Sequence, residues 1–213
     1  MKTIYAIPGL GTTEKLFSFL KLNGCELKVL SWPKPLPQQS MKEYAQMFVE
    51  QINTNEKFYL LGVSLGGMLC SELSHLVNAE KTILISSCKT KNELPILIRA
   101  LNYIPLQKIL PEVLLRKMAL HSQWLLGFKK EFEADFKEMI NSMPENYFLN
   151  TINMIVNWDN TKAPKHCIHI HGTSDRLLLF NNVKADHVIQ NGNHAMIVYK
   201  ADEISEILNR FLD

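Results

Sequence analysis

The segment YLLGVSLGGMLCSEL, from Tyr59 to Leu73, places a short apolar run directly before a glycine-rich turn and a helix-like run directly after it. A run with so little polar alternation suits a central strand that is buried on both faces of a sheet. The turn holds one serine, Ser64, between Gly62 and Gly66. The segment therefore matches G-x-S-x-G in the strand-to-helix setting that this motif requires.

Five further β-type runs accompany this strand, and helical segments separate several of them. The six runs cover residues 3–7, 26–30, 57–63, 81–86, 166–171 and 186–190. Apolar residues recur with helical spacing over 41–52, 68–76 and 201–213. Strands that alternate with helices favour a mostly parallel sheet with helices on both faces. We therefore expect an α/β fold of about six strands in a single domain over residues 1–213.

This alternation stops between about residues 89 and 157, where the pattern is typical of helices only. Three prolines punctuate these helices, at positions 105, 111 and 144. Phe132, Phe136 and Ile140 repeat at i, i+4 and i+8 with charged residues on the opposite face, as in an amphipathic surface helix. We interpret 89–143 as a helical insertion that lies over the edge of the sheet, after which the last helix rejoins the core.

Composition and charge exclude several classes of protein. A chain of 213 residues with 46% hydrophobic and 21% charged residues fits one globular domain. The net charge of +2 and the lack of a basic stripe argue against a nucleic-acid partner. The apolar runs are too short for a membrane span or a signal peptide, and the four cysteines form no CxxC pair. We therefore expect a cytoplasmic protein in which Cys70 and Cys88 are buried, and its oligomeric state stays open.

A sharp turn around Ser64 lifts its hydroxyl clear of the sheet, at a helix N-terminus that favours negative charge. The alternative interpretation is that Ser64 only caps the helix. A serine needs a base to become a nucleophile, and His194 is the candidate because it follows the last strand in a loop with Asn191 and Gly192. The other six histidines lie within expected helices or at expected strands.

The base in turn needs a carboxylate that orients it, and Asp175 follows the strand before His194 after a Gly-Thr-Ser turn. Asp159 and Asp186 are fallback candidates, and Glu93 is the nearest carboxylate after the 81–86 strand. The order Ser64, Asp175, His194 is the one expected of this strand–turn–helix arrangement.

Two backbone N–H groups are candidates to stabilise an oxyanion. One belongs to Leu65, directly after the serine, and the other to Leu10 in the early loop AIPGLGTTEKLF (6–17). Glycines at 9 and 11 let that loop turn so that the Leu10 N–H points inward.

Together these motifs resemble the α/β-hydrolase family over essentially the whole chain. The matching segments are Pro8-Gly9-Leu10-Gly11, Gly62-x-Ser64-x-Gly66-Gly67, His171-Gly172-x-x-Asp175 and Gly192-x-His194. The resemblance implies a nucleophile at Ser64, a base at His194, an acid at Asp175 and a substrate-shaping cap over 89–143. Two departures are the Pro8 that stands where many members have histidine, and the missing pair of leading antiparallel strands.

The expected activity is hydrolysis of a small-to-medium carboxylic ester or thioester through an acyl-enzyme, with a small-molecule acyl substrate as the partner. Thioesterase or acyltransferase activity, C–C bond hydrolysis or lyase chemistry on the same fold, and a catalytically silent binding module stay open. No metal or cofactor is expected, since His169 and His171 lack further ligands and fit a structural role. Lys129 and Lys130 fit a solvated helix face.

Overall fold

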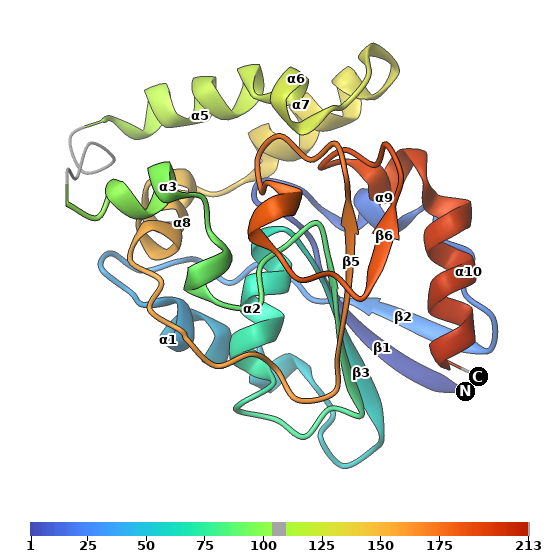
Figure 1. The fold of residues 1–213 in the computed structure, drawn as a ribbon. Helices are drawn as coiled ribbons and strands as arrows, with labels where there is room; N and C mark the ends of the chain where they lie inside the picture. The colour runs from blue at the N-terminus through green and yellow to red at the C-terminus, as the bar shows by residue number, and fades with distance from the viewer. Residues whose placement is uncertain (104–109, 213) are drawn as a thin grey trace.

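Six parallel strands form one sheet in the order β2-β1-β3-β4-β5-β6 (Figure 1). The computed structural model describes residues 1–103 and 110–212. The strands are β1 (Lys2–Ile7), β2 (Cys25–Val29), β3 (Phe58–Val63), β4 (Lys81–Ile85), β5 (Cys167–Gly172) and β6 (His187–Ile189). The prediction of a mostly parallel sheet of about six strands is confirmed, and no predicted strand end is off by more than one residue.

The apolar β3 is a central strand, paired with β1 on one side and β4 on the other. All its residues are buried except Tyr59, because helices cover both faces of the sheet. On one face α1 (Met41–Gln46) and α2 (Leu65–Leu73) pack against a core that includes Tyr5 and Leu60. Figure 1 shows α10 (Ala201–Leu212) on the far side of the sheet from α2, next to the short α9 (Met196–Tyr199).

Two predicted helices have different bounds in the structure. The predicted helix over 41–52 ends at Gln46, and a separate 3-10 turn covers Val49–Gln51. Helix α2 begins at Leu65, three residues before the predicted start, because the chain enters the helix immediately after Ser64. Because no residue separates Ser64 from α2, the serine lies directly at the start of the helix.

Between β4 and β5 the described residues form only helices and loops. The helices are α3 (Ile96–Ala100), α5 (Glu112–His121), α6 (Gln123–Leu126), α7 (Glu133–Ser142) and α8 (Tyr147–Val156). In Figure 1, α5 and α6 cross the top of the view, above the sheet, while α3 and α8 lie to the left. The predicted break at Pro105 lies outside the described residues, whereas Pro111 directly precedes α5 and Pro144 shortly precedes α8.

The buried residues of these helices agree with the predicted amphipathic pattern. Phe132, Phe136 and Ile140 are at most 6% exposed and join the core cluster on the α10 face of the sheet. Cys70 and Cys88 are fully buried, as expected. No helix in the described part of the chain is both long and apolar enough to cross a lipid bilayer.

Candidate active site

Ser64 forms a tight turn between β3 and α2. Its backbone has φ 54° and ψ −120°, a positive-φ conformation that is costly for a residue with a side chain. The surrounding chain holds it there, because the Ser64 N–H donates to the Ile85 carbonyl at 3.1 Å and the Ser87 hydroxyl donates to the Ser64 carbonyl at 2.7 Å. Ser64 occupies the N-cap position of α2, as the alternative interpretation has it, but its hydroxyl makes no capping hydrogen bond to the helix.

The two glycines of the motif allow the strand and the helix to approach each other closely. A Cβ added at Gly62 would lie 2.3 Å from the Gly66 carbonyl oxygen, and one added at Gly66 would lie 2.1 Å from the carbonyl oxygen of Ile7. Both distances are far below a van der Waals contact with backbone, which cannot move aside. Small residues at these two positions are therefore what permits the turn.

His194 lies beside Ser64, although 130 residues separate them in the chain. Its Nε2 is 2.9 Å from the Ser64 Oγ, and its Nδ1 is 2.7 Å from the Asp175 Oδ2. An ionised carboxylate only accepts hydrogen bonds, so Nδ1 carries the proton and the lone pair of Nε2 faces the serine. The His194 side chain is 7% exposed, so the protein shields this arrangement from most of the solvent.

The loop that carries His194 is tied to the helices above the sheet and to the loop after β5. The N–H of Ala195 donates to the Leu126 carbonyl at 2.9 Å, and the Asn193 side chain donates to the Gly127 carbonyl at 3.0 Å. On the other side, Ser174 N–H donates to the Gly192 carbonyl at 2.9 Å. The end of α6 therefore helps to hold the imidazole in place.

Asp175 is 4% exposed and has hydrogen-bond donors on both carboxylate oxygens. Its Oδ1 accepts from the N–H groups of Leu177 and Leu178, both at 2.9 Å, while Oδ2 faces His194. Burial alone would raise the pKa of Asp175, but His194, His171 and the Leu178 N–H outweigh it and hold that pKa below its ordinary value. The carboxylate is therefore ionised at neutral pH.

The other acidic candidates lie elsewhere. Asp186 accepts from the His169 N–H at 2.8 Å and lies 3.6 Å from the Lys89 ammonium. Glu93 accepts from the Lys89 N–H at 2.6 Å, and Asp159 is exposed. Of the four carboxylates that the sequence offers, the structure joins Asp175 to His194.

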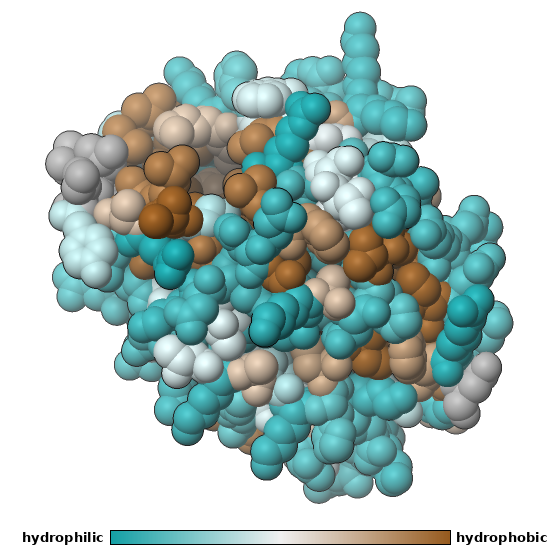
Figure 2. Space-filling view, viewed as in Figure 1, coloured by the Kyte–Doolittle hydropathy of each residue, from teal (hydrophilic) through white to brown (hydrophobic). Residues whose placement is uncertain are grey.

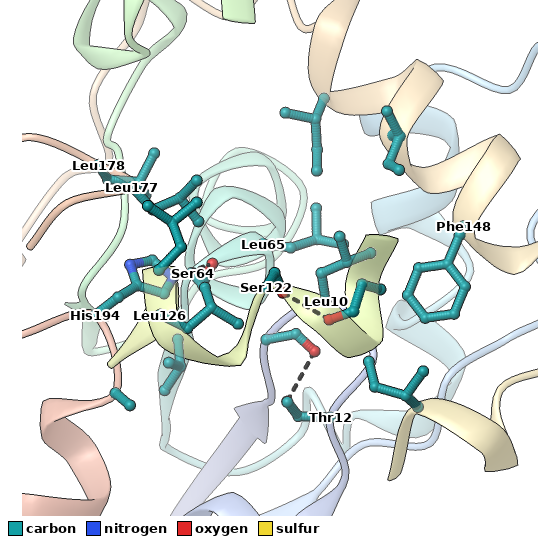
Figure 3. A pocket seen from close by; sticks show the side chains of 18 of the residues that line it. Leu10, Thr12, Ser64, Leu65, Ser122, Leu126, Phe148, Leu177, Leu178 and His194 are labelled. Carbon is teal, nitrogen blue, oxygen red and sulfur yellow. Dashed lines mark hydrogen bonds between the residues drawn. The ribbon is translucent and has the colours of Figure 1, made fainter. Parts of the chain in front are cut away.

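The early loop lies close to Ser64. A Cβ added at Gly9 would lie 3.4 Å from the Ser64 Cβ, and Leu10 and Leu65 both line the cavity that contains the serine (Figure 3). The hydroxyl of Thr12 donates to the Gly9 carbonyl at 2.8 Å and closes the turn. Among the described residues, the N–H groups of Leu10 and Leu65 have no hydrogen-bond acceptor, so both are available to a ligand.

Ser64 opens into a cavity of about 360 Å³ between the sheet and the helices that follow β4. In Figure 3, Leu177 and Leu178 lie on the His194 side of Ser64, and Leu10 and Phe148 lie on the other side. Helix α8 contributes Phe148 and Ile152 to the wall, so the cavity is shaped by helices beyond the predicted 89–143 segment as well as within it.

Three contributions to the site were not anticipated from the sequence. Ser87 anchors the turn, and the N–H groups of Leu177 and Leu178 orient the carboxylate. The sequence favoured a structural role for His171. In the structure, its Nε2 is 2.8 Å from the Leu178 carbonyl oxygen and 3.5 Å from the Asp175 Oδ2. Its position four residues before Asp175 was the available signal, but the return of the chain to Leu178 is not visible in the sequence.

Comparisons with known proteins agree with the predicted fold. No family model and no curated protein matches the sequence. Solved structures do match, among them an esterase from Exiguobacterium antarcticum, with a TM-score of 0.73, 16% identity, and coverage of 99% of this chain and 91% of that one. A thermophilic esterase from Thermogutta terrifontis matches with a TM-score of 0.70 and 13% identity, over 100% of this chain and 89% of that one.

A meta-cleavage product hydrolase from Pseudomonas fluorescens IP01 matches with a TM-score of 0.69 and 12% identity, over 100% of this chain and 90% of that one. The sequences of these proteins differ widely from that of this chain, but their folds match it over nearly its whole length. The chain therefore has the α/β-hydrolase fold, and the resemblance predicted from its motifs is confirmed at the level of the fold.

Proposed function

We propose that this protein is a serine hydrolase that cleaves a carboxylic ester or thioester. The observation that carries the proposal is the unbroken chain of contacts from Asp175 through His194 to Ser64, at 2.7 Å and 2.9 Å, beside an apolar cavity. An ionised Asp175 accepts a hydrogen bond from His194 Nδ1 and so leaves the lone pair of Nε2 toward the Ser64 hydroxyl, as nucleophilic attack requires.

In the acylation step, the Ser64 Oγ forms a bond to the acyl carbon while its proton moves to His194 Nε2. The carbonyl oxygen becomes an oxyanion, and the N–H groups of Leu10 and Leu65 stabilise it. When the oxyanion collapses, the bond to the leaving group breaks, and His194 gives its proton to the departing oxygen or sulfur. Asp175 stabilises the imidazolium throughout without taking its proton.

In the deacylation step, a water molecule replaces the leaving group. His194 takes a proton from this water, whose oxygen bonds to the acyl carbon, and the bond to Ser64 Oγ breaks as the proton returns to the serine. The products are a carboxylic acid and an alcohol or thiol, and the enzyme is restored. The side chains and amides named here suffice for this cycle.

The structural neighbours support a hydrolase. Two of the neighbours are esterases, and a third is a meta-cleavage product hydrolase. Their likeness is one of fold, so the assignment of activity rests on the geometry around Ser64. Because the cavity beside that serine is apolar, it favours a substrate with an apolar acyl group over one with a polar acyl group.

The test is hydrolysis of p-nitrophenyl butyrate by the wild type and by Ser64→Ala. We expect the substitution to lower kcat at least about 1,000-fold, because the hydroxyl is the attacking group. Ser74→Ala, at the outer end of α2, is the matched control and should hydrolyse the ester like the wild type. Equal turnover by wild type and Ser64→Ala would reject the proposal, and a wild type that turns over neither esters nor thioesters would favour a silent binding module.

A further inference from the structure

The cavity beside Ser64 has a closed inner end and an open mouth. At the inner end, Leu16, Phe136 and Ile140 are each 1% exposed, although all three line the cavity. Met118 also lines the cavity and is 54% exposed, which places the mouth on its side. Figure 2 shows a hollow in the same part of the molecule, with hydrophobic side chains gathered around it. A ligand can therefore enter from solvent and extend one end into the core.

The wall of this cavity offers almost nothing to a polar ligand. None of the described residues that line it is Asp, Glu, Lys or Arg. Apart from Ser64 and His194, its polar side chains are Thr12 and Ser122, and each hydroxyl already donates to a nearby backbone carbonyl. The two distances are 2.8 Å to Gly9 and 2.7 Å to Ala119 (Figure 3). The part of a substrate that fills this space is therefore hydrocarbon.

The size of the cavity limits the length of that hydrocarbon. Its volume is about 360 Å³. A water molecule takes roughly 30 Å³ in the liquid, and a methylene group is of similar size, so the space holds on the order of a dozen such groups. An acetyl group would leave most of it empty, and a long-chain fatty acyl group would exceed it.

The chemistry of the proposed function decides which half of the substrate lies inside. The leaving group must diffuse away before water can attack the acyl-enzyme, whereas the acyl group stays bonded to Ser64 until the last step. In the part of the chain that the structure describes, the lining side chain with the largest exposure is Met118, so we place the departing leaving group on that side and the acyl group at the closed end.

We propose that the substrate is a medium-chain acyl ester or thioester, whose hydrocarbon chain of roughly eight to twelve carbons lies beneath α5 and α7. This inference rests on the proposed function of Ser64. Each additional methylene that leaves water for an apolar wall is expected to raise kcat/KM about fourfold, until the cavity is full.

Ala119 on α5 is positioned to set the upper limit of chain length. It lines the cavity, and its methyl is the smallest side chain that α5 contributes to the wall. A larger side chain at this position would occupy volume that the acyl chain needs. Ala134 on α7 is also within these helices but is exposed and does not line the cavity, which makes it a matched control.

The experiment measures kcat/KM for p-nitrophenyl esters from acetate to laurate, below their micelle concentrations, so that only the acyl chain varies. For the wild type we expect the optimum between octanoate and laurate. For Ala119→Phe we expect the ratio of octanoate to butyrate to fall at least tenfold, with a smaller fall for Ala119→Leu, which keeps the test valid if the phenylalanine variant does not fold. Ala134→Phe should keep the wild-type ratio.

A wild-type optimum at acetate or butyrate, reached through Ser64, would overturn the chain-length inference and leave the proposed function intact. An unchanged ratio in folded Ala119→Phe and Ala119→Leu would place the acyl chain outside this cavity and would also overturn it. If Ser64 reacts with no ester and with no alkyl fluorophosphonate, the proposed function fails, and the inference fails with it.

Discussion

At the scale of single residues, the state of one imidazole decides what the site can do. His194 can accept the Ser64 proton only while its own proton is on Nδ1, and the Asp175 Oδ2 at 2.7 Å keeps it there. Two backbone N–H groups, from Leu177 and Leu178, hold the other carboxylate oxygen, so the acid cannot rotate away. The orientation of the His194 imidazole is therefore set by the protein before any ligand binds.

Replacing Asp175 by asparagine tests this directly. An asparagine can still accept the two backbone N–H groups, but its NH₂ then faces His194 and favours the tautomer whose proton is on Nε2. We expect ester kcat to fall by about 10⁴-fold, as the equivalent substitution does in a serine protease, with little change in melting temperature. Asp186→Asn, where the carboxylate contacts Lys89 instead of His194, is the control. Near-normal turnover by Asp175→Asn would show that this carboxylate is dispensable.

The residues of this site differ in how far the sequence predicts them. Ser64, Asp175 and His194 were identifiable because each follows the end of an expected strand, and carboxyl ends of parallel strands meet at one edge of a sheet. Ser87 and His171 were not, because their contacts depend on how neighbouring strands and a returning loop pack in space.

At the scale of elements, the site depends on how closely α2 approaches β1 and β3. The Gly66 position faces the Ile7 carbonyl, so the first turn of the helix lies against the end of β1. Predicted strands agreed with the structure to within one residue, since the apolar runs end in clear turn residues. The wall of the cavity was harder to predict, because helical spacing does not say which face of α5 points inward.

Gly66→Ala is expected to be strongly destabilising, because the new methyl would lie 2.1 Å from the Ile7 carbonyl oxygen. Overpacking against rigid backbone costs about 3 kcal/mol or more, or prevents folding. Urea unfolding measures this. Gly24→Ala is the comparison, because a Cβ there meets nothing within 4 Å and its φ of +63° leaves a cost of only about 1 to 2 kcal/mol. Equal losses at the two positions would contradict the close packing of α2.

At the scale of the whole molecule, the sheet brings histidine side chains into the core as well as into the site. His169 is fully buried, and its ring lies edge-on to His171 with centroids 5.3 Å apart. Burial and the neighbouring His171 lower the pKa of His169 to about 3. The folded protein therefore keeps this ring neutral over a pH range in which an unfolded chain protonates it.

This pKa makes stability depend on pH with a definite sign. Below about pH 6.5 the unfolded chain binds a proton at position 169 that the folded protein does not bind until about pH 3, so the free energy of unfolding falls as pH falls through that window. One such group contributes a slope of up to about 1.4 kcal/mol per pH unit. Denaturant unfolding of His169→Gln between pH 4 and 7.5 should show a slope reduced by that amount relative to wild type. The difference in the free energy of unfolding between the two proteins at pH 7.5 measures the change in packing alone. Identical slopes for wild type and His169→Gln would contradict the lowered pKa of His169.

The central claim is that distant segments of this chain converge to make the Ser64 hydroxyl a nucleophile. The most direct measurement is mass spectrometry of the protein after reaction with an alkyl fluorophosphonate, followed by digestion to locate the adduct. We predict one adduct per chain on the peptide that contains Ser64, none in Ser64→Ala, and much slower labelling in His194→Ala. An adduct on another residue, or equal labelling in Ser64→Ala, would contradict the account.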